Sequence, residues 1–250
     1  MRIISVSSQK GGTGKTSTAG AIGQAAVKQG KRALVIDLDA QGSLTTITGA
    51  RGDSGGSYAL LKGRDPADLI QHIEGQPDII PASLQLAGAD AELSNQPGRD
   101  FLLQTAIKPL KGYDLIIIDT APTLGTMLIN SLTAATELLI PLQADTFAVQ
   151  SLYQLADTIG QVQRYCNPAL TITGALLTRY SPRTVLARDL RRAIAGKCTA
   201  LGIPLLKTYI RDGVALKEAQ TVKQNLFDYA PRSNPARDYL ALCKEIKIGG

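Results

Sequence analysis

Eight consecutive residues near the start of the chain have the types and the order of a phosphate-binding loop, Gln9-Lys10-Gly11-Gly12-Thr13-Gly14-Lys15-Thr16. An apolar run at residues 3–6 precedes the loop, and a stretch rich in small residues follows it. Glycines let backbone N–H groups converge on one anion, and a helix that begins at the loop adds favourable partial charge. Lys15 is then placed to reach the β- and γ-phosphates of a nucleotide, and the Thr16 hydroxyl to bind Mg²⁺. We expect the nucleotide to contact Lys10, Gly11, Gly12, Thr13, Gly14, Lys15, Thr16 and Ser17.

The loop departs from the standard pattern G-x-x-x-x-G-K-[ST] at its first position, where Gln9 replaces glycine. A second lysine, Lys10, stands just before the glycine pair, although Lys15 already serves the phosphates. One interpretation is that Lys10 is a solvated side chain. The alternative is that Lys10 reaches across a dimer interface to the partner's nucleotide and stabilises charge on the γ-phosphate, as an arginine finger does.

Three carboxylates follow apolar runs that are typical of buried strands. Asp37 and Asp39 end the run at residues 31–39, and Asp119 ends the run at residues 113–119. Mg²⁺ prefers hard oxygen ligands and keeps several waters, so one or two carboxylates near the phosphates suffice. We expect Thr16 and Asp119 to hold Mg²⁺, with Asp37 beside the metal. Asp39 is then free to orient the attacking water, and the catalytic residues are predicted to be Lys10, Lys15 and Asp39.

The elements that must position these residues alternate between strand and helix. Such alternation predicts an α/β fold with a doubly wound, mostly parallel sheet flanked by helices, in one domain at residues 1–250. Ligands of such sheets bind at the carboxyl ends of the strands, where the loop and the three carboxylates fall. Strands are expected at residues 3–6, 31–39, 78–82, 113–119, 137–142, 171–178 and 203–209. Helices are expected at residues 16–29, 58–72, 98–110, 126–135, 146–165, 184–201 and 213–223, and from residue 233 to near the end.

Composition excludes several other classes of protein. His72 is the one histidine among the 250 residues. Because there is no second histidine, we expect no Ser/His/Asp or Cys/His hydrolase arrangement. The three cysteines are widely spaced and form no metal-ligand pattern, which is typical of a reducing compartment. No apolar run of about 18 residues and no signal-peptide pattern is present, so we expect a cytoplasmic protein.

Positive charge is concentrated in the last third of the chain. Residues 179–250 contain 14 Lys and Arg against 6 Asp and Glu, whereas residues 1–178 contain 13 against 15. A basic region on an otherwise neutral protein points to a polyanionic partner. Few aromatic residues are interleaved with the basic ones, which favours phosphate contacts with duplex DNA over base stacking. The apolar stripe of the predicted helix 184–201, from Leu186 to Leu201, is expected to dock and to leave its arginines outward. The predicted DNA contacts are Arg183, Arg188, Arg191, Arg192, Arg211, Lys223 and Arg232.

Several of these motifs together resemble the ParA/MinD family of ATPases. The loop from Lys10 to Thr16 resembles the deviant Walker A loop of that family. Asp37-Leu38-Asp39-Ala40-Gln41-Gly42-Ser43 is similar to its D-x-D-P-Q-G-N segment, with Ala40 for proline and Ser43 for asparagine. Residues 113–122 resemble its Y-D-x-I-I-I-D-x-x-P strand, and residues 177–184 its L-T-x-Y-x-x-R-T segment. The resemblance covers nearly the whole chain and is strongest to the ParA/Soj partition branch without an N-terminal helix-turn-helix domain.

The resemblance implies an ATP-dependent homodimer that sandwiches two MgATP molecules, each Lys10 reaching the opposite nucleotide. It also implies binding to double-stranded DNA without sequence preference, on the nucleoid. A ParB-type centromere-binding partner would stimulate slow ATP hydrolysis, and the cycle would segregate plasmids or chromosomes. Residues 210–221 depart from the family's I-P-R-N-V-R-L-S-E-A-P-S, so contacts to adenine and to DNA near them are less defined.

Other members of the same superfamily are alternatives. A MinD-like membrane ATPase is not favoured, because residues 244–250 lack an amphipathic basic tail. A redox or metallochaperone relative needs paired cysteines, which the spacing here does not supply. A ParA-like ATPase that positions a protein cargo on the nucleoid would have the same core and stays open as an alternative.

Overall fold

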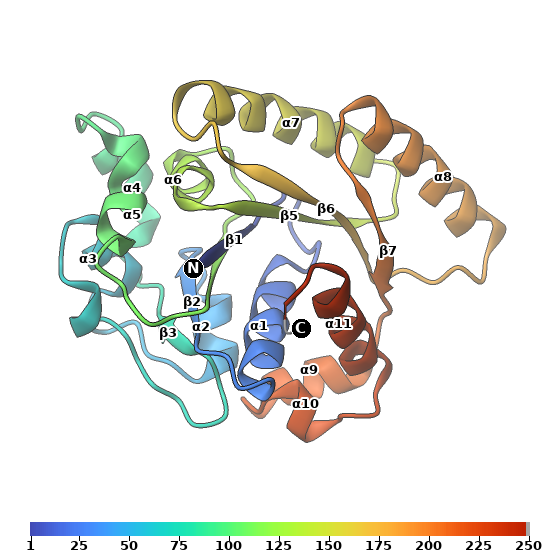
Figure 1. Ribbon diagram of the computed structural model, residues 1–250, viewed down its shortest axis with the longest axis horizontal. Helices are drawn as coiled ribbons and strands as arrows, with labels where there is room; N and C mark the ends of the chain where they lie inside the picture. Colours follow the sequence, from blue (N-terminus) through green and yellow to red (C-terminus); the bar gives the residue numbers. More distant parts are fainter. Residues whose placement is uncertain (249–250) are drawn as a thin grey trace.

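The computed structural model describes residues 1–248, in which seven strands form one parallel sheet of order β3-β2-β4-β1-β5-β6-β7. Helices cover both faces of the sheet (Figure 1), so the predicted doubly wound α/β fold is confirmed. Each strand overlaps a run that the sequence predicts as a strand. The strands are β1 (Arg2–Val6), β2 (Ala33–Leu38), β3 (Asp78–Ile80), β4 (Leu115–Thr120), β5 (Glu137–Gln143), β6 (Thr171–Thr178) and β7 (Leu205–Ile210).

The helices differ from the prediction mainly where they are short. The expected helix at residues 58–72 contains only α3 (Gly56–Leu61) and a single 3₁₀ turn, η1 (Pro66–Asp68). Three helices of four to eight residues were not predicted, since so short a segment carries little periodicity: α2 (Ser43–Thr48), α4 (Leu86–Leu93) and α10 (Leu226–Tyr229). The remaining helices fall in the expected ranges: α1 (Lys15–Lys28), α5 (Leu102–Ile107), after the 3₁₀ turn η2 (Arg99–Phe101), α6 (Thr126–Ala134), α7 (Ala148–Tyr165), α8 (Val185–Ala200), α9 (Val214–Thr221) and α11 (Asn234–Glu245).

Two hydrophobic cores lie on opposite faces of the sheet. Side chains alternate along β4, so Ile116 and Ile118 join one core while Ile117 joins the other. The first core is closed by α4–α8, and the second by α1, α10 and α11. Figure 1 shows α1, α9, α10 and α11 together below the sheet and α6 and α7 above it. Because both faces are covered, β2 and β4 are buried along their whole length, which explains their almost unbroken apolar sequences.

No helix within residues 1–248 is both long enough and apolar enough to cross a lipid bilayer.

Candidate nucleotide site and basic surface

The loop after β1 forms the turn that the sequence predicts. Gly12 and Gly14 have φ angles of 75° and 83°, a left-handed conformation that residues with a Cβ rarely adopt. The Thr178 hydroxyl at the end of β6 donates to the Thr13 carbonyl (2.7 Å), and the Ser8 and Thr13 hydroxyls are 2.6 Å apart. These contacts fix the loop against the sheet with α1 starting at Lys15, so its first N–H groups face the loop.

A cavity of about 400 Å³ opens at this loop. It lies at the carboxyl ends of the strands, where open parallel sheets bind ligands. Within the described chain it brings together Gly11, Gly12, Gly14, Lys15, Thr16 and Ser17 with Asp39, Ser43, Ile47, Pro122, Arg179 and Gln220.

Lys15 is buried with its ammonium group inside the loop. The amine donates a hydrogen bond to the carbonyl oxygen of Lys10 at 3.1 Å, which holds the ammonium group against the loop. Burial lowers the pKa of Lys15, while the charges of Asp119 and Asp39 act in the opposite direction. Burial disfavours the charged form of Lys15, and a bound phosphate would stabilise that form.

Asp119 is the residue whose surroundings most clearly call for a cation. It is fully buried, and neither carboxylate oxygen has a hydrogen-bond partner among residues 1–248. Burial raises the pKa of Asp119 well above its usual range, Asp37 and Asp39 raise it further, and the Thr16 hydroxyl and Lys15 lower it. Buried charges are normally paired or bind a metal. The orphaned carboxylate therefore fits Mg²⁺ with Thr16.

Asp37 lies beside Asp119 because the two residues are paired in register on β2 and β4. One Asp37 oxygen accepts bonds from the Thr45 N–H (2.8 Å) and hydroxyl (2.7 Å), and the other from the Asp39 N–H (3.1 Å). Burial raises the pKa of Asp37 to about 6, although these hydrogen bonds oppose the shift. Its oxygens therefore anchor α2 beside the site, and a direct role for Asp37 at the metal stays a prediction.

Asp39 stands at the rim of the cavity, just beyond the end of β2. One of its carboxylate oxygens accepts a bond from the Gln41 N–H (2.9 Å), which orients the side chain. The half-exposed carboxylate faces the same cavity as Lys15 and Thr16. This position is compatible with the predicted role of Asp39 in orienting water.

Lys10 does not point into free solvent. It forms an ion pair with Asp145 in the segment after β5, and its amine lies 5.6 Å from the centroid of the Phe147 ring. The same segment is tied to the loop by Gln143, whose amide donates to the Gly12 carbonyl at 2.8 Å. Sequence reasoning did not assign Gln143, Asp145 or Phe147 to the site.

The basic helix α8 presents only part of the expected arginine set. Arg188 and Arg192 are exposed, as is Arg183 in the preceding loop. Arg191 instead packs back on the sheet, with its guanidinium 5.7 Å and 5.6 Å from the ring centroids of Tyr180 and Tyr209.

The predicted docking of the whole α8 stripe is wrong in its first turn. Leu186 is 69% exposed, and Val185 beside it is 64% exposed. Ile194 and Cys198 are buried in the core, so the helix docks through its later turns only.

The other three predicted DNA contacts lie apart from α8. Arg211 follows β7 and makes a two-pronged ion pair with Asp238, with contacts of 2.6 to 3.2 Å. Lys223 follows α9 and Arg232 precedes α11, so both belong to the helices that pack with α1 on the opposite face of the sheet from α7. The seven residues therefore come from several elements that lie on both faces of the sheet.

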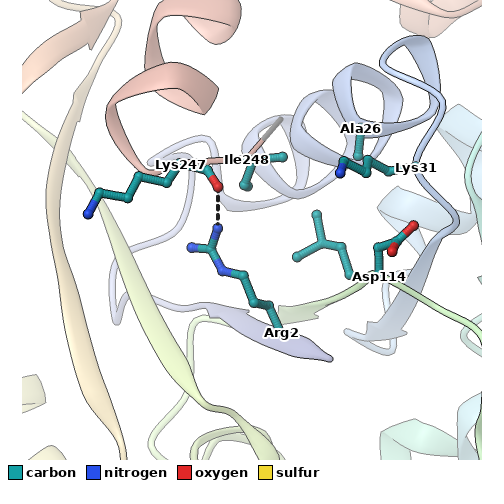
Figure 2. Close-up of a pocket in the computed structure, with 7 residues that line it drawn as sticks. Arg2, Ala26, Lys31, Asp114, Lys247 and Ile248 are labelled. Atoms are coloured by element: carbon teal, nitrogen blue, oxygen red, sulfur yellow. Dashed lines mark hydrogen bonds between the residues drawn. The ribbon is translucent and has the colours of Figure 1, made fainter. Parts of the chain in front are cut away.

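A second cavity, of about 220 Å³, lies at the amino ends of the central strands β1 and β4, opposite the nucleotide loop (Figure 2). It is bounded by Arg2, the last turn of α1 and the residues after α11. The Arg2 guanidinium is already bound to Glu137 (2.7 Å) and to the Lys247 carbonyl (2.8 Å). Helix carboxyl ends disfavour anions, so this cavity is not suited to phosphate.

Comparison with known proteins identifies the family. A family model described as an AAA domain matches residues 1–172. The sporulation initiation inhibitor protein Soj of Bacillus subtilis is 37% identical, covering 100% of this chain and 99% of that protein. The chromosome-partitioning ATPase Soj of Thermus thermophilus is 34% identical, covering 98% of this chain and 95% of that protein. A crystal structure of cobyrinic acid a,c-diamide synthase from Mycobacterium smegmatis with ADP and magnesium superimposes with a TM-score of 0.84 at 34% identity, covering 100% and 96% of the two chains. The chain described here belongs to the ParA/Soj family of chromosome-partitioning ATPases.

Proposed function

We propose that this chain is a DNA-partition ATPase that works as an ATP-dependent dimer on non-specific double-stranded DNA and is switched by a ParB-type partner. One observation carries the proposal: a phosphate-binding loop lies next to the buried, unpartnered carboxylate of Asp119. That pairing is what a triphosphate with Mg²⁺ requires. Binding of ADP and magnesium by the Mycobacterium smegmatis protein supports the same ligands here. We take residues 1–250 as one ATPase domain.

The positions of the site residues support the following proposed roles. Lys15 and the loop N–H groups would bind the phosphates, and Thr16 and Asp119 would hold Mg²⁺, with Asp37 beside them. The bound metal would offset charge on the phosphate oxygens. Asp39 orients the attacking water from the rim of the cavity. Lys10 supplies the last positive charge to the nucleotide of the partner subunit.

Exposed apolar side chains support a dimer at the same edge of the sheet. Six large ones follow the carboxyl ends of five different strands, where the nucleotide loop also lies, and burial against a second copy would remove them from water. They are Leu84 after β3, Leu124 after β4, Phe147 after β5, Val185 and Leu186 after β6, and Val214 after β7.

Contact with DNA is proposed for the exposed arginines near α8. Arg183, Arg188 and Arg192 are exposed and can contact phosphates without unpacking the core, although Arg192 must exchange an exposed ion pair with Asp189 (3.4 Å) to do so. Arg191 supports them from below by holding α8 to Tyr180 and Tyr209. Arg211, Lys223 and Arg232 are secondary contacts, because they lie on other elements and Arg211 is already paired.

A second candidate comes from the Mycobacterium smegmatis relative, whose name denotes amide formation on cobyrinic acid. The sequence identity of this chain to that relative, 34%, is close to its identity to the partition ATPases, 37% and 34%, so amide formation is an alternative function. Positioning of a protein cargo on the nucleoid is the other alternative and would use the same ATPase cycle.

The test is ATP hydrolysis by the purified chain alone, with DNA, and with DNA plus the product of the adjacent gene. We expect slow turnover alone and strong stimulation by the two together. If neither DNA nor the product of the adjacent gene changes the rate of ATP hydrolysis, but a carboxylic acid substrate and an ammonia donor raise it, the amide-forming alternative would be supported instead.

A further inference from the structure

We infer that Arg179 is an additional nucleotide-binding residue, which contacts the phosphate nearest the ribose from within the same subunit. The inference rests on the proposed assignment of the loop after β1 as the phosphate site.

The backbone on both sides of Arg179 is fixed. The Thr178 hydroxyl donates to the carbonyls of Thr13 (2.7 Å) and Leu142 (3.2 Å), which ties the end of β6 to the nucleotide loop. Tyr180 is buried, and its N–H donates to the Ile210 carbonyl at 3.0 Å. Arg179 is therefore held between two anchored residues.

At this position the chain adopts a conformation that is costly for arginine. Arg179 has a φ of 49°, in the left-handed region that residues with a Cβ rarely occupy. Local backbone strain of this kind persists where the surrounding structure enforces it and is concentrated at ligand sites. The residue in this strained conformation is an arginine and not a glycine, and it lines the nucleotide cavity.

The position of Arg179 along that cavity indicates which phosphate it reaches. A smaller cavity of about 60 Å³ adjoins the larger one, and it is lined by residues 210–213, Leu216 and Tyr239. Gly14, Ser17, Arg179 and Gln220 line both cavities, whereas Lys15, Thr16 and Asp39 line only the larger. Hydrolysis is proposed to occur near Asp39. Arg179 thus lies at the opposite end of the phosphate cavity.

The charge of Arg179 is also available. Arg211 lines the smaller cavity, but its guanidinium is bound to Asp238. No comparable carboxylate holds Arg179 among residues 1–248, and its side chain is exposed to the cavity. The planar guanidinium suits a phosphate because it can donate two hydrogen bonds at once.

The Arg179→Gly variant provides the test, because glycine adopts the observed φ without strain and the fold should be kept or stabilised. Titrations with MgADP and with a non-hydrolysable MgATP analogue should show dissociation constants higher by roughly 10- to 100-fold, and by a similar factor for both nucleotides. The KM for ATP should rise accordingly, with a smaller effect on kcat. Arg179→Lys should recover part of the affinity, since it keeps the charge but loses the fork.

Three results would overturn the inference: unchanged affinity for MgADP, a loss confined to the triphosphate, or a loss confined to DNA binding at saturating ATP. The last would place Arg179 with Arg183 on the DNA surface. Lys15→Ala is the control for the underlying assignment. If the unaltered protein binds neither nucleotide, or if Lys15→Ala binds both normally, the proposed function falls and the inference falls with it.

Discussion

Lys10 and Asp145 form an ion pair within one chain, although 135 positions separate them in the sequence. Asp145 also accepts a bond from the Phe147 N–H at 2.9 Å, so the segment after β5 is shaped to hold the lysine. In the isolated chain, the residue proposed to act on a partner's nucleotide is therefore held by its own subunit. In the proposed dimer, a contact with phosphate would replace the contact with Asp145.

Asp145→Asn should ease that exchange. Lys10 and Asp145 are about one-third exposed, at 34% and 29%, and pairs of this kind contribute about 0.2–1 kcal/mol. Because a dimer has two such pairs to release, together about 0.4–2 kcal/mol, we expect the ATP-bound dimer to form at a protein concentration lower by about two- to thirtyfold. Sedimentation with and without an ATP analogue measures the effect. A weaker dimer in the variant would mean that Asp145 serves the interface itself.

Asp119→Asn should have opposite effects on stability and on metal binding. The unpartnered carboxylate has a raised pKa, so its cost to folding is absent below the pKa of the unfolded chain, grows as pH rises from there to the native pKa, and is constant above it. Without metal, the variant should gain about 1–3 kcal/mol of unfolding free energy at pH 8 and less at pH 5. Denaturant titrations at the two pH values test this, and added MgATP should stabilise only the unaltered protein. A variant less stable than wild type at pH 8 would remove the argument for a cation beside Asp119.

Replacing the exposed arginines of the α8 region should weaken DNA binding without unfolding the helix. We expect the triple variant Arg183/Arg188/Arg192→Ala to lose ATP-dependent DNA affinity and to show a shallower dependence on salt, with a slope reduced by roughly one per lost phosphate contact. Arg191→Ala is the matched comparison. Because Arg191 packs on Tyr180 and Tyr209, it should lower thermal stability by a few degrees. Full DNA affinity in the triple variant would exclude this surface.

Asp39→Ala should separate ATP binding from hydrolysis. The residue is at the cavity rim and is not needed for the fold of the loop, so MgATP binding and dimer formation should persist while turnover falls by roughly 100-fold or more. The variant should accumulate on DNA in the presence of ATP, as followed by gel shift or co-sedimentation. If it neither dimerises nor binds DNA, Asp39 does not orient the water.

The sequence predicts the sheet and the loop well because their signals are local. The unbroken apolar run of β4 and the glycines of the loop are each visible within a few residues. Helix α2 is too short to show periodicity in the sequence, and the contacts of its Thr45 with Asp37 are tertiary. Likewise, the spacing of arginines on a helix could not reveal that Arg191 packs on tyrosines from beyond its own helix.

Contacts between distant segments explain the other surprises at the site. The pairing of Arg211 with Asp238 and of Lys10 with Asp145 depends on which loops the sheet brings together. Leu186 fits a helical stripe in sequence, yet α8 extends beyond the core at its first turn, so the side chain is exposed.

The central claim is that Lys10 acts on the nucleotide of the other subunit, and mixing two inactive variants tests it most directly. Lys10→Ala leaves an intact Asp39 in its own site, and Asp39→Ala leaves an intact Lys10 to donate. Each variant alone should be inactive. In an equimolar mixture, half of the dimers are heterodimers with one competent site, so turnover should recover to about a quarter of the wild-type value. No recovery in a mixture shown to contain heterodimers would contradict the account, because a lysine acting within its own subunit leaves every site defective.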